Sequence, residues 1–596
     1  MQDIVLGVAG WRAIQALHPG TDVCHLNEGH AAFAVLERAR LLAGQTGLSF
    51  WEAFWAARGG NVFTTHTPVD AAFDRFPAAL VAKYLAYTSA SGIGAELQDL
   101  LALGRTDVDA QDEPFNMAYL ALRGSAVTFG VSRLHGTVSR QLFQPLFQGW
   151  PTAEVPIGHI TNGVHVPSWD SAGADNIWTA ACGKDRWRGM PDNLSASIEN
   201  TTDDLLWAMR GENRHRLVES VRRRLRKQLG ERGLPAAMVA LAERVLDPNV
   251  LTLGFARRFT GYKRPNLLLH DPERLRRLLA NQQRPIQLVV AGKAHPEDGE
   301  GKRMIQEWLQ FGERPDCRRR VVFLEDYDLS IAQELVQGVD VWINTPRRPW
   351  EACGTSGMKV LVNGGINLSV LDGWWAEASE AGLGWGIGDP KDAADGRDQD
   401  LIDTERLYAV IEEEVVPEFY NQDASGVPRD WLKRMRRSMA SLTPAYATTR
   451  MIREYISKAY VPAAEGLRQR LADGAAIAKG IALWQQRVRR YWSGLHLGEP
   501  NIACEGDAWR FFVPVYLGEM EAEDIRVELY ADPLGAETPE TLPLVRGEPI
   551  PGAVNGYIYS GHAPTSRPPE HFTGRIVPDC PGAQIPGELP LIRWQR

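Results

Sequence analysis

The 596-residue sequence lacks the marks of several protein classes. Its six cysteines lie far apart with no CxxC pair, so neither a disulfide framework nor a zinc site is indicated. No apolar run approaches the ~20 residues that cross a bilayer, and no charged segment followed by an apolar one marks a signal peptide. HxxxH-type spacing is absent as well. We therefore expect a cytoplasmic protein with no membrane association and no metal.

The excess of charge of one sign is also small. With a formal net charge of −9, 44% hydrophobic and 23% charged residues, the composition is that of a globular protein. Such a balance gives no general attraction to nucleic acid, and the basic run at 218–233 is better interpreted as the solvated face of a helix. At roughly 150 residues per domain, the length predicts three or four domains.

The middle of the sequence has a regular pattern. Short apolar runs rich in β-branched residues alternate with helical segments, which is typical of a parallel sheet covered on both faces. The expected strands are 249–256, 286–292, 320–326, 339–345 and 366–372, and the expected helices are 264–280, 301–312 and 329–338. This pattern predicts a Rossmann-like domain of about five strands, with ligands beyond their carboxyl ends. The candidate loops follow Ala256, Gly292, Glu325 and Thr345.

The two ends of the chain differ from the middle. The amino-terminal part offers only three strand candidates, 22–27, 61–66 and 156–161, so the remaining strands are missing or come from a partner. Past residue 497, the β-type runs 510–518, 524–532, 557–563 and 571–578 predict an all-β region, whereas the glycine-rich 382–388 is interpreted as a loop. The predicted division is a partial Rossmann-like domain at 1–165, a second Rossmann-like domain with return helices at 166–465, a helical linker at 466–496 and a β-sandwich-like appendage at 497–596.

A cluster of cations follows the first strand of the middle region. FARRFTGYKR (255–264) places Arg257, Arg258, Lys263 and Arg264 around Tyr262. Guanidinium and ammonium groups at the carboxyl end of a parallel strand match phosphate oxygens well. A solvated basic turn is the alternative, but the position favours an anion site.

A lysine lies in an apolar setting after the fourth strand. In EACGTSGMKVLVNGG (351–365), Gly354 to Gly357 precede a helical run whose free N–H groups suit an anion, although no GK[ST] ending indicates ATP. Lys359 follows one turn later. Burial and nearby cations lower a lysine pKa and allow a Schiff base, so this pattern suits pyridoxal phosphate. A lysine that extends to solvent from a helix edge is the alternative.

The motifs together are more specific. EACGTSGMKVLVNGG followed by INLSVLDGWW resembles the pyridoxal-phosphate segment of the alpha-glucan phosphorylase family (glycogen, starch and maltodextrin phosphorylases), especially its shorter bacterial and archaeal branch. LNEGHAAFAVLE, FTTHTP, FNMAYLALRGS, ITNGVHVPSW, FARRFTGYKR, VVAGKAHP and VVFLEDY occur in the family's order over residues 1–460. The resemblance implies a two-domain glycosyltransferase fold with paired Rossmann-like domains. It also implies phosphorolysis of terminal α-1,4-glucosyl units to glucose 1-phosphate with retention.

The resemblance assigns roles to residues. Lys359 would carry pyridoxal phosphate, whose phosphate exchanges protons with the substrate phosphate. The substrate phosphate would be held by Arg258 and Lys263, and the cofactor phosphate by Thr355, Arg257 and Tyr327. The glucosyl and glucan positions would be lined by Tyr262, Glu351, Cys353, Gly354, His66, Asn162, Glu28, His30 and His135. Serine is commoner in the family where Cys353 stands, and lysine where Arg257 stands.

One family feature is absent. Longer members carry a GGLG-type loop upstream of the LNEGH-like segment, and GGLG does not occur here. MQDIVLG resembles an internal helix of the family, so part of the first domain is expected to be missing. A miscalled start, a split gene and a decayed remnant would each give such a chain.

These observations leave alternatives to a phosphorylase that acts on α-glucan and phosphate. A nucleotide-sugar-dependent glucan synthase of the same fold would not need Lys359. A catalytically impaired fragment would act as a glucan-binding or split-enzyme subunit. We also expect a homo-oligomer, or a partner chain that supplies the missing amino-terminal half.

Overall fold

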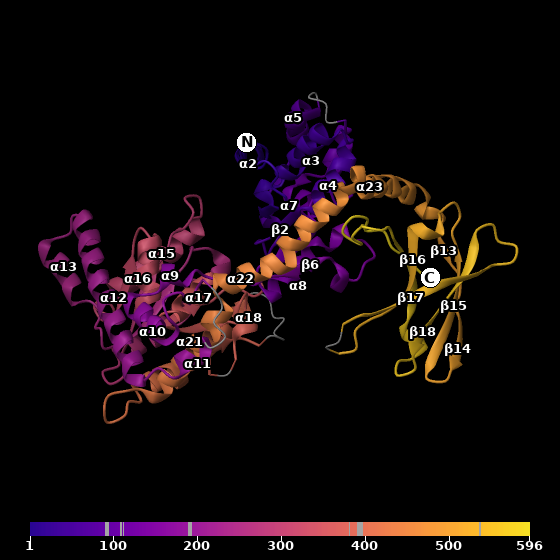
Figure 1. The fold of residues 1–596 in the computed structure, drawn as a ribbon. Coiled ribbons are helices and arrows are strands. Elements are labelled where there is room, and N and C mark those ends of the chain that lie inside the picture. The colour runs from indigo at the N-terminus through magenta and orange to yellow at the C-terminus, as the bar shows by residue number, and fades with distance from the viewer. Residues whose placement is uncertain are drawn as a thin grey trace. The chain divides into compact units, whose positions relative to one another are not determined.

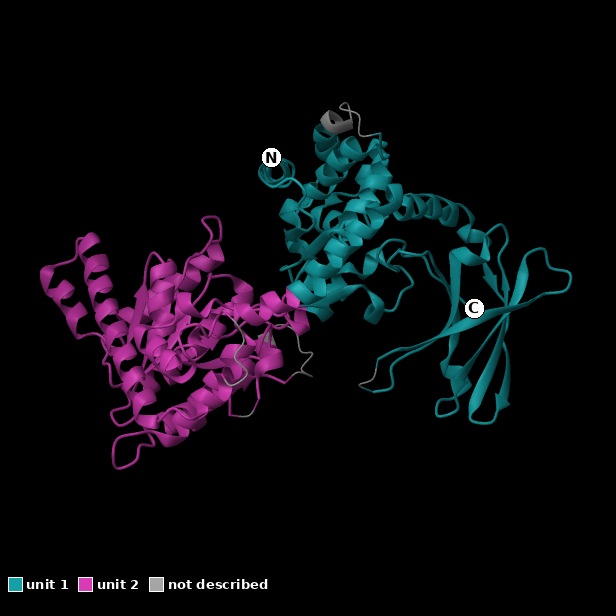
Figure 2. Cartoon of the chain, in the orientation of Figure 1, with its two compact units in different colours: residues 1–130, 136–159, 456–596 teal, residues 131–135, 160–455 magenta. Residues whose placement is uncertain are grey.

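The computed structural model (Figure 1) describes residues 1–89, 94–107, 110, 112–188, 194–380, 382–389, 397–535 and 538–595. The chain divides into two compact units, coloured in Figure 2. The first unit comprises 1–130, 136–159 and 456–596, and the second comprises 131–135 and 160–455. Among the described residues, no helix is both long enough and apolar enough to cross a membrane.

The second unit is built on a six-stranded parallel sheet with the order β12-β11-β10-β7-β8-β9. Its strands are β7 (Leu251–Ala256), β8 (Ile286–Ala291), β9 (Val321–Leu324), β10 (Val341–Asn344), β11 (Ile366–Val370) and β12 (Trp385–Ile387). Numbered from β7, this is the 3-2-1-4-5-6 order common in doubly wound sheets, whose connections reverse direction between β7 and β10. Ligands of such sheets bind at this reversal, beyond the carboxyl ends of the strands.

The sequence explains how this sheet forms. Every residue of β7 to β11 is buried, as expected for β-branched strands covered on both faces. Three connecting helices begin after an aspartate whose carboxylate accepts a backbone N–H of the first turn, which stabilises a helix start. These helices and their caps are α14 (Pro272–Ala280) after Asp271, α15 (Gly299–Glu313) after Asp298, and α16 (Leu329–Gly338) after Asp328.

The predicted strands of this sheet are confirmed, with one more strand than expected. The interpretation of 382–388 as a loop was wrong, because β12 forms there and pairs with β11 in parallel. The error has a physical reason. An edge strand needs a partner on one side only, and it can be short and rich in glycine. A Cβ on Gly386 would lie 2.8 Å from a side-chain atom of Leu371, so close packing favours glycine at this position.

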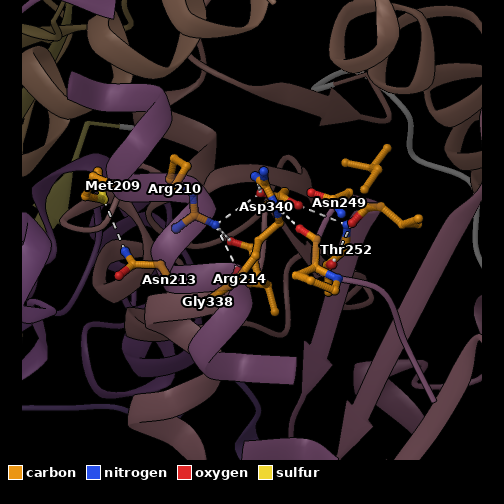
Figure 3. A network of polar contacts seen from close by, with 12 residues as sticks. Met209, Arg210, Asn213, Arg214, Asn249, Thr252, Gly338 and Asp340 are labelled. Carbon is orange, nitrogen blue, oxygen red and sulfur yellow. Dashed lines mark hydrogen bonds and ion pairs between the residues drawn. The ribbon is translucent and has the colours of Figure 1, made fainter. Parts of the chain in front are cut away.

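A buried carboxylate ties the long helix α12 (Asp203–Glu231) to the sheet (Figure 3). Asp340, directly before β10, accepts from Arg210 Nη2 at 3.2 Å and Arg214 Nη1 at 2.9 Å. Its other oxygen accepts from the Thr252 backbone N–H of β7 at 3.0 Å. Arg210 also donates to four backbone carbonyls, those of Gln337, Gly338, Val339 and Asn363. The network therefore joins α12 to the two strands at the reversal of the sheet.

The first unit contains a smaller parallel sheet with the order β1-β2-β5-β6. β1 (Cys24–Asn27), β2 (Asn61–Thr64) and β6 (Ile157–His159) lie in the predicted segments. β5 (Val127–Gly130) was missed. It lies between α7 (Met117–Arg123) and α8 (Arg133–Phe143), so it did not stand out from the helical pattern on either side.

The carboxyl-terminal region of the first unit is an eight-stranded antiparallel sheet. The four predicted runs lie in β15 (Ala508–Tyr516), β16 (Ile525–Ala531), β18 (Gly556–Pro564) and β19 (Thr573–Pro578). The segment between β19 and β20 (Arg593–Trp594) packs on the helices of the same unit. Glu588 forms a buried ion pair with Arg58 of α4 (Phe50–Gly59) at 2.7 Å and with Arg470 of α23 (Val461–Tyr491) at 2.6 Å. The antiparallel region is thus fixed to the rest of its unit by a carboxylate shared between two arginines.

We predict that Asp340→Asn strongly destabilises the second unit. The change keeps the shape but leaves two buried guanidinium groups without a counter-charge, which costs about 3–5 kcal/mol. Urea denaturation followed by tryptophan fluorescence measures the loss. Glu212→Gln is the matched control. Glu212 pairs with Arg216 on the exposed face of α12 at 2.7 Å, and its loss should cost less than ~1 kcal/mol. Equal effects of the two variants would contradict this account of α12.

Candidate active site

Two of the predicted cations, Arg257 and Lys263, come together with Glu351 at the reversal of the second unit's sheet, whereas Arg264 pairs with Asp400 and Asp403. Arg257 directly follows β7, and the loop that carries Glu351 follows β10, the neighbouring strand. The loop after β8 packs closely against the Arg257 backbone at Gly292. The φ of Gly292 is +158°, and a Cβ there would lie 2.0 Å from the Arg257 carbonyl oxygen. Only a residue without a side chain allows the two loops to approach so closely.

Glu351 bridges two cations. Its Oε2 accepts from Arg257 Nη2 and lies 2.9 Å from Lys263 Nζ. The side chains of Arg257, Glu351 and Lys263 are only 4%, 10% and 15% exposed, so these charges meet largely without water. Arg257 Nη1 is buried and has no hydrogen-bond partner among the described residues. Since a buried donor without an acceptor is costly, this nitrogen is available for an anion. Arg258 is exposed beside this group.

The electrostatics of this cluster are strongly perturbed. Burial raises the pKa of Glu351, but Arg257 and Lys263 outweigh it and hold the carboxylate ionised. Burial and then Arg257 lower the pKa of Lys263 to about 8, although Glu351 opposes the shift. Burial and then Glu351 raise the pKa of Tyr262 to about 12, so its phenol stays neutral and can donate a hydrogen bond. The site therefore holds one ionised acid, two cations and one neutral hydroxyl at neutral pH.

Lys359 lies on α17 (Thr355–Leu361) and contacts an aromatic ring. Its Nζ is 3.8 Å from the centre of the Trp169 ring, and burial lowers its pKa. Within the part of the chain that the structure describes, no carboxylate forms an ion pair with Lys359. Desolvation without a counter-charge favours the neutral amine, which is the nucleophilic form. The direction agrees with the expectation from the sequence, although burial is its cause and the neighbouring cations do not contribute.

The loop between Glu351 and Lys359 is tightly held. Gly354 has φ +88°, a left-handed conformation that glycine adopts at little cost, and Thr355 begins α17 directly after it. The Cys353 carbonyl accepts from Trp374 N at 2.9 Å. Burial raises the pKa of the Cys353 thiol, so this cysteine is neutral and not a nucleophile.

The other predicted residues of the second unit have different surroundings. Tyr327, after β9, packs, as Trp169 does, against the apolar cluster that includes Val360. His135 is buried, and its Nδ1 accepts from Val131 N at 3.1 Å, which gives it a structural role in this loop. Asn162 is half-buried and its backbone carbonyl accepts from Arg450 at 3.0 Å.

The three candidates of the first unit lie at the carboxyl ends of β1 and β2. Glu28, with φ +70°, accepts from Gly29 N, from His66 N at 2.6 Å and from Thr67 Oγ1 at 3.0 Å. It therefore joins the loops after the two strands and fixes His66. His30 Nδ1 lies 2.5 Å from Asp74 Oδ2.

The prediction of no metal site stays untested. The possible ligand atoms of Asp3, His30 and Asp74 lie within 4.8 Å of one another. The His30–Asp74 contact accounts for this cluster, and both side chains are largely exposed.

Two contacts were not predicted from the sequence. The pairing of Glu351 with Arg257 and Lys263 could not be derived, because it depends on strand order. Trp169 ends the ITNGVHVPSW motif, yet nothing in its spacing indicated that it contacts Lys359.

The geometry defines an α/β protein whose parallel sheet presents basic side chains at its switch point. A family model described as carbohydrate phosphorylase matches residues 1–382. A glycogen phosphorylase of Mycobacterium tuberculosis is 38% identical over 615 positions, covering 99% of this chain and 70% of that protein. A maltodextrin phosphorylase of Thermococcus litoralis is 34% identical over 602 positions, covering 100% of this chain and 70% of that protein. A glycogen phosphorylase of Aquifex aeolicus is 37% identical over 463 positions, covering 77% of this chain and 65% of that protein.

The chain belongs to the carbohydrate phosphorylase family. The family predicted from the ordered motifs is thereby confirmed. The roles of individual site residues are not tested by these comparisons and stay predictions.

We predict that Glu351→Gln increases the affinity for an inorganic anion. The change removes the resident negative charge from Arg257 and Lys263, so sulfate should bind about tenfold more tightly. Isothermal titration calorimetry at about pH 6, where Lys263 is charged and sulfate does not titrate, measures the effect. Glu405→Gln, at a largely exposed carboxylate of the same unit, should leave the affinity unchanged. Weaker or equal sulfate binding by Glu351→Gln would contradict the bridging role.

Proposed function

We propose that the chain catalyses phosphorolysis of terminal α-1,4-glucosyl units of glycogen or maltodextrin, with release of glucose 1-phosphate and retention. The observation that carries the proposal is the group of Arg257, Lys263 and exposed Arg258 at the switch point of the sheet. Basic side chains in this place are suited to phosphate. The printed names of the relatives, glycogen and maltodextrin phosphorylase, support glucan as the second substrate.

In this proposal the second unit binds and orients the substrate phosphate. Arg258 and Lys263 contact the phosphate oxygens, and Lys263 stabilises negative charge most effectively below its pKa of about 8. Until an anion binds, the Glu351 carboxylate offsets the repulsion between the two cations with which it pairs, Arg257 and Lys263. Tyr262, which stays protonated, donates a hydrogen bond toward the sugar. The burial of Arg257, Lys263 and Glu351 keeps water away from their charges, which strengthens each electrostatic contact.

The residues present fit pyridoxal phosphate. Lys359 has a lowered pKa and no acidic partner in the described ranges, as a lysine that holds an aldehyde requires. The Arg257 Nη1 group is buried and has no acceptor among the described residues, so it could donate to the cofactor phosphate. Thr355 and Tyr327 would complete the contacts to that phosphate. When bound, the cofactor would supply a phosphate group that exchanges a proton with the substrate phosphate. Trp169 would keep the Lys359 side chain in place.

The remaining candidates are assigned to sugar binding. In the second unit these are Glu351, Cys353, Gly354, Asn162 and His135, with Cys353 contributing its backbone N–H because its thiol is buried. In the first unit they are Glu28, His30 and His66. We assign each parallel sheet to one Rossmann-like domain of a two-domain glycosyltransferase fold. The cytoplasmic location and a homo-oligomer or partner chain stay predictions.

We expect Lys359→Ala to abolish both cofactor retention and phosphorolysis. Borohydride reduction of the purified protein, followed by peptide mass spectrometry, should place the cofactor mass on the peptide that contains Lys359. Release of glucose 1-phosphate from maltodextrin and inorganic phosphate measures activity. Lys302→Ala, at an exposed lysine of the same unit, should retain both properties. A colourless wild type that extends glucan from a nucleotide sugar would overturn the proposal.

A further inference from the structure

A buried carboxylate to which no role was assigned from the sequence, Asp372 of the INLSVLDGWW segment, contacts the Glu351 backbone. Asp372 follows β11 by two residues and is 1% exposed. In the described part of the chain, no basic side chain forms an ion pair with it. Such an acid is costly to bury unless its oxygens receive hydrogen bonds. Its contacts therefore indicate what the residue does.

Both oxygens of Asp372 accept backbone N–H groups. Oδ2 accepts from Glu351 N at 2.9 Å, and Oδ1 accepts from Gly373 N at 2.8 Å. The two turns also touch directly, because a Cβ on Gly373 would lie 2.3 Å from the Cys353 carbonyl oxygen. The same carbonyl accepts from Trp374 N at 2.9 Å. Asp372 thus fixes the loop after β10 to the loop after β11.

This contact determines where the Glu351 side chain starts. The Glu351 backbone N–H is held by Asp372 while its carboxylate reaches Arg257 and Lys263 on the loop after β7. A shift of the Glu351 backbone would change the geometry of both ion pairs at once. Hydrogen bonds behind a functional side chain commonly provide this kind of positioning.

The charge of Asp372 adds a pH dependence. Burial and then Glu351 raise its pKa to about 7, although the two backbone N–H groups and Arg348 oppose the shift. Among the described residues, Tyr262 also interacts electrostatically with Asp372, and its phenol stays neutral. Above this pKa the carboxylate accepts both N–H groups. Below it, a proton occupies one acceptor oxygen and weakens one of the two contacts.

We propose that Asp372 is a positioning residue, which acts on the phosphate step through Glu351 by holding the Glu351 backbone against the end of β11. The proposal rests on the proposed function for its activity readout. It assigns no contact between Asp372 and substrate or cofactor. Its effect should therefore disappear when the Glu351 carboxylate is absent.

The first test is a double-mutant cycle on the full chain. Asp372→Asn keeps the size of the side chain but removes its charge. The asparagine NH2 then faces one of the two backbone N–H groups and cannot accept its hydrogen bond. We expect kcat/KM for phosphate at about pH 7.5 to fall about tenfold. The double variant with Glu351→Gln should match Glu351→Gln alone within about twofold, because both changes act through one group. Multiplying effects would overturn the proposal, and so would an unchanged Asp372→Asn enzyme.

The second test is the pH profile. The wild type should lose activity as the pH falls through about 7, in step with protonation of Asp372, and Asp372→Asn should keep only the shallower limb that titration of the substrate phosphate itself causes. Asp316→Asn, at an exposed aspartate of the same unit, should keep the wild-type profile. A merely structural role would lower activity at every pH and leave the steeper limb in place, which would contradict the proposal.

The third test needs no turnover. Hydrogen exchange followed by mass spectrometry should show the backbone N–H of Glu351 exchanging about tenfold faster in Asp372→Asn than in the wild type or Asp316→Asn. Equal exchange would overturn the proposal even if activity changed. If the wild type releases no glucose 1-phosphate, the proposed function fails, and the exchange comparison still decides whether Asp372 holds Glu351.

Discussion

One carboxylate shared between two cations determines the organisation of the second unit's site. Arg257 and Lys263 extend from the same loop and would repel each other in a buried setting. Glu351, from the loop after the neighbouring strand, offsets both charges. Burial alone would raise the pKa of this acid, so the two cations and the carboxylate keep one another ionised. An incoming anion therefore meets cations that are already in place, which is the arrangement that makes electrostatic stabilisation effective.

The two strands that carry this arrangement are held in place by a second buried charge network. β7 and β10 are neighbours, and Asp340 joins both of them to α12 through its contacts with Arg210, Arg214 and Thr252. The strands whose ends carry the site are thus fixed by a second carboxylate shared between two arginines. Buried charge groups of this kind contribute little net stability when complete, but their loss is costly. They fix the relative positions of α12, β7 and β10, which the apolar core alone would not determine.

The sequence predicted the parts of the site better than their pairing. The cation cluster after Ala256 and the lysine in an apolar helix were visible, because residue type and a preceding strand are local signals. The contact between Arg257 and Glu351 spans 94 positions and arises from strand order, which local patterns do not contain. β5 was missed because it lies between two helical segments, and β12 because it lies in a glycine-rich segment, so neither stood out as a separate strand.

The site depends on the sharing of the Glu351 charge between Arg257 and Lys263. Carbon-13 methylation of the lysines, followed by an NMR pH titration of the full chain, measures it most directly. Lys263→Arg identifies the resonance. Lys263 should titrate near pH 8 in the wild type and at lower pH in Glu351→Gln, since the carboxylate favours the charged form of the lysine. An unshifted Lys263 resonance in Glu351→Gln, or titration at the ordinary lysine pKa, would contradict this sharing of charge.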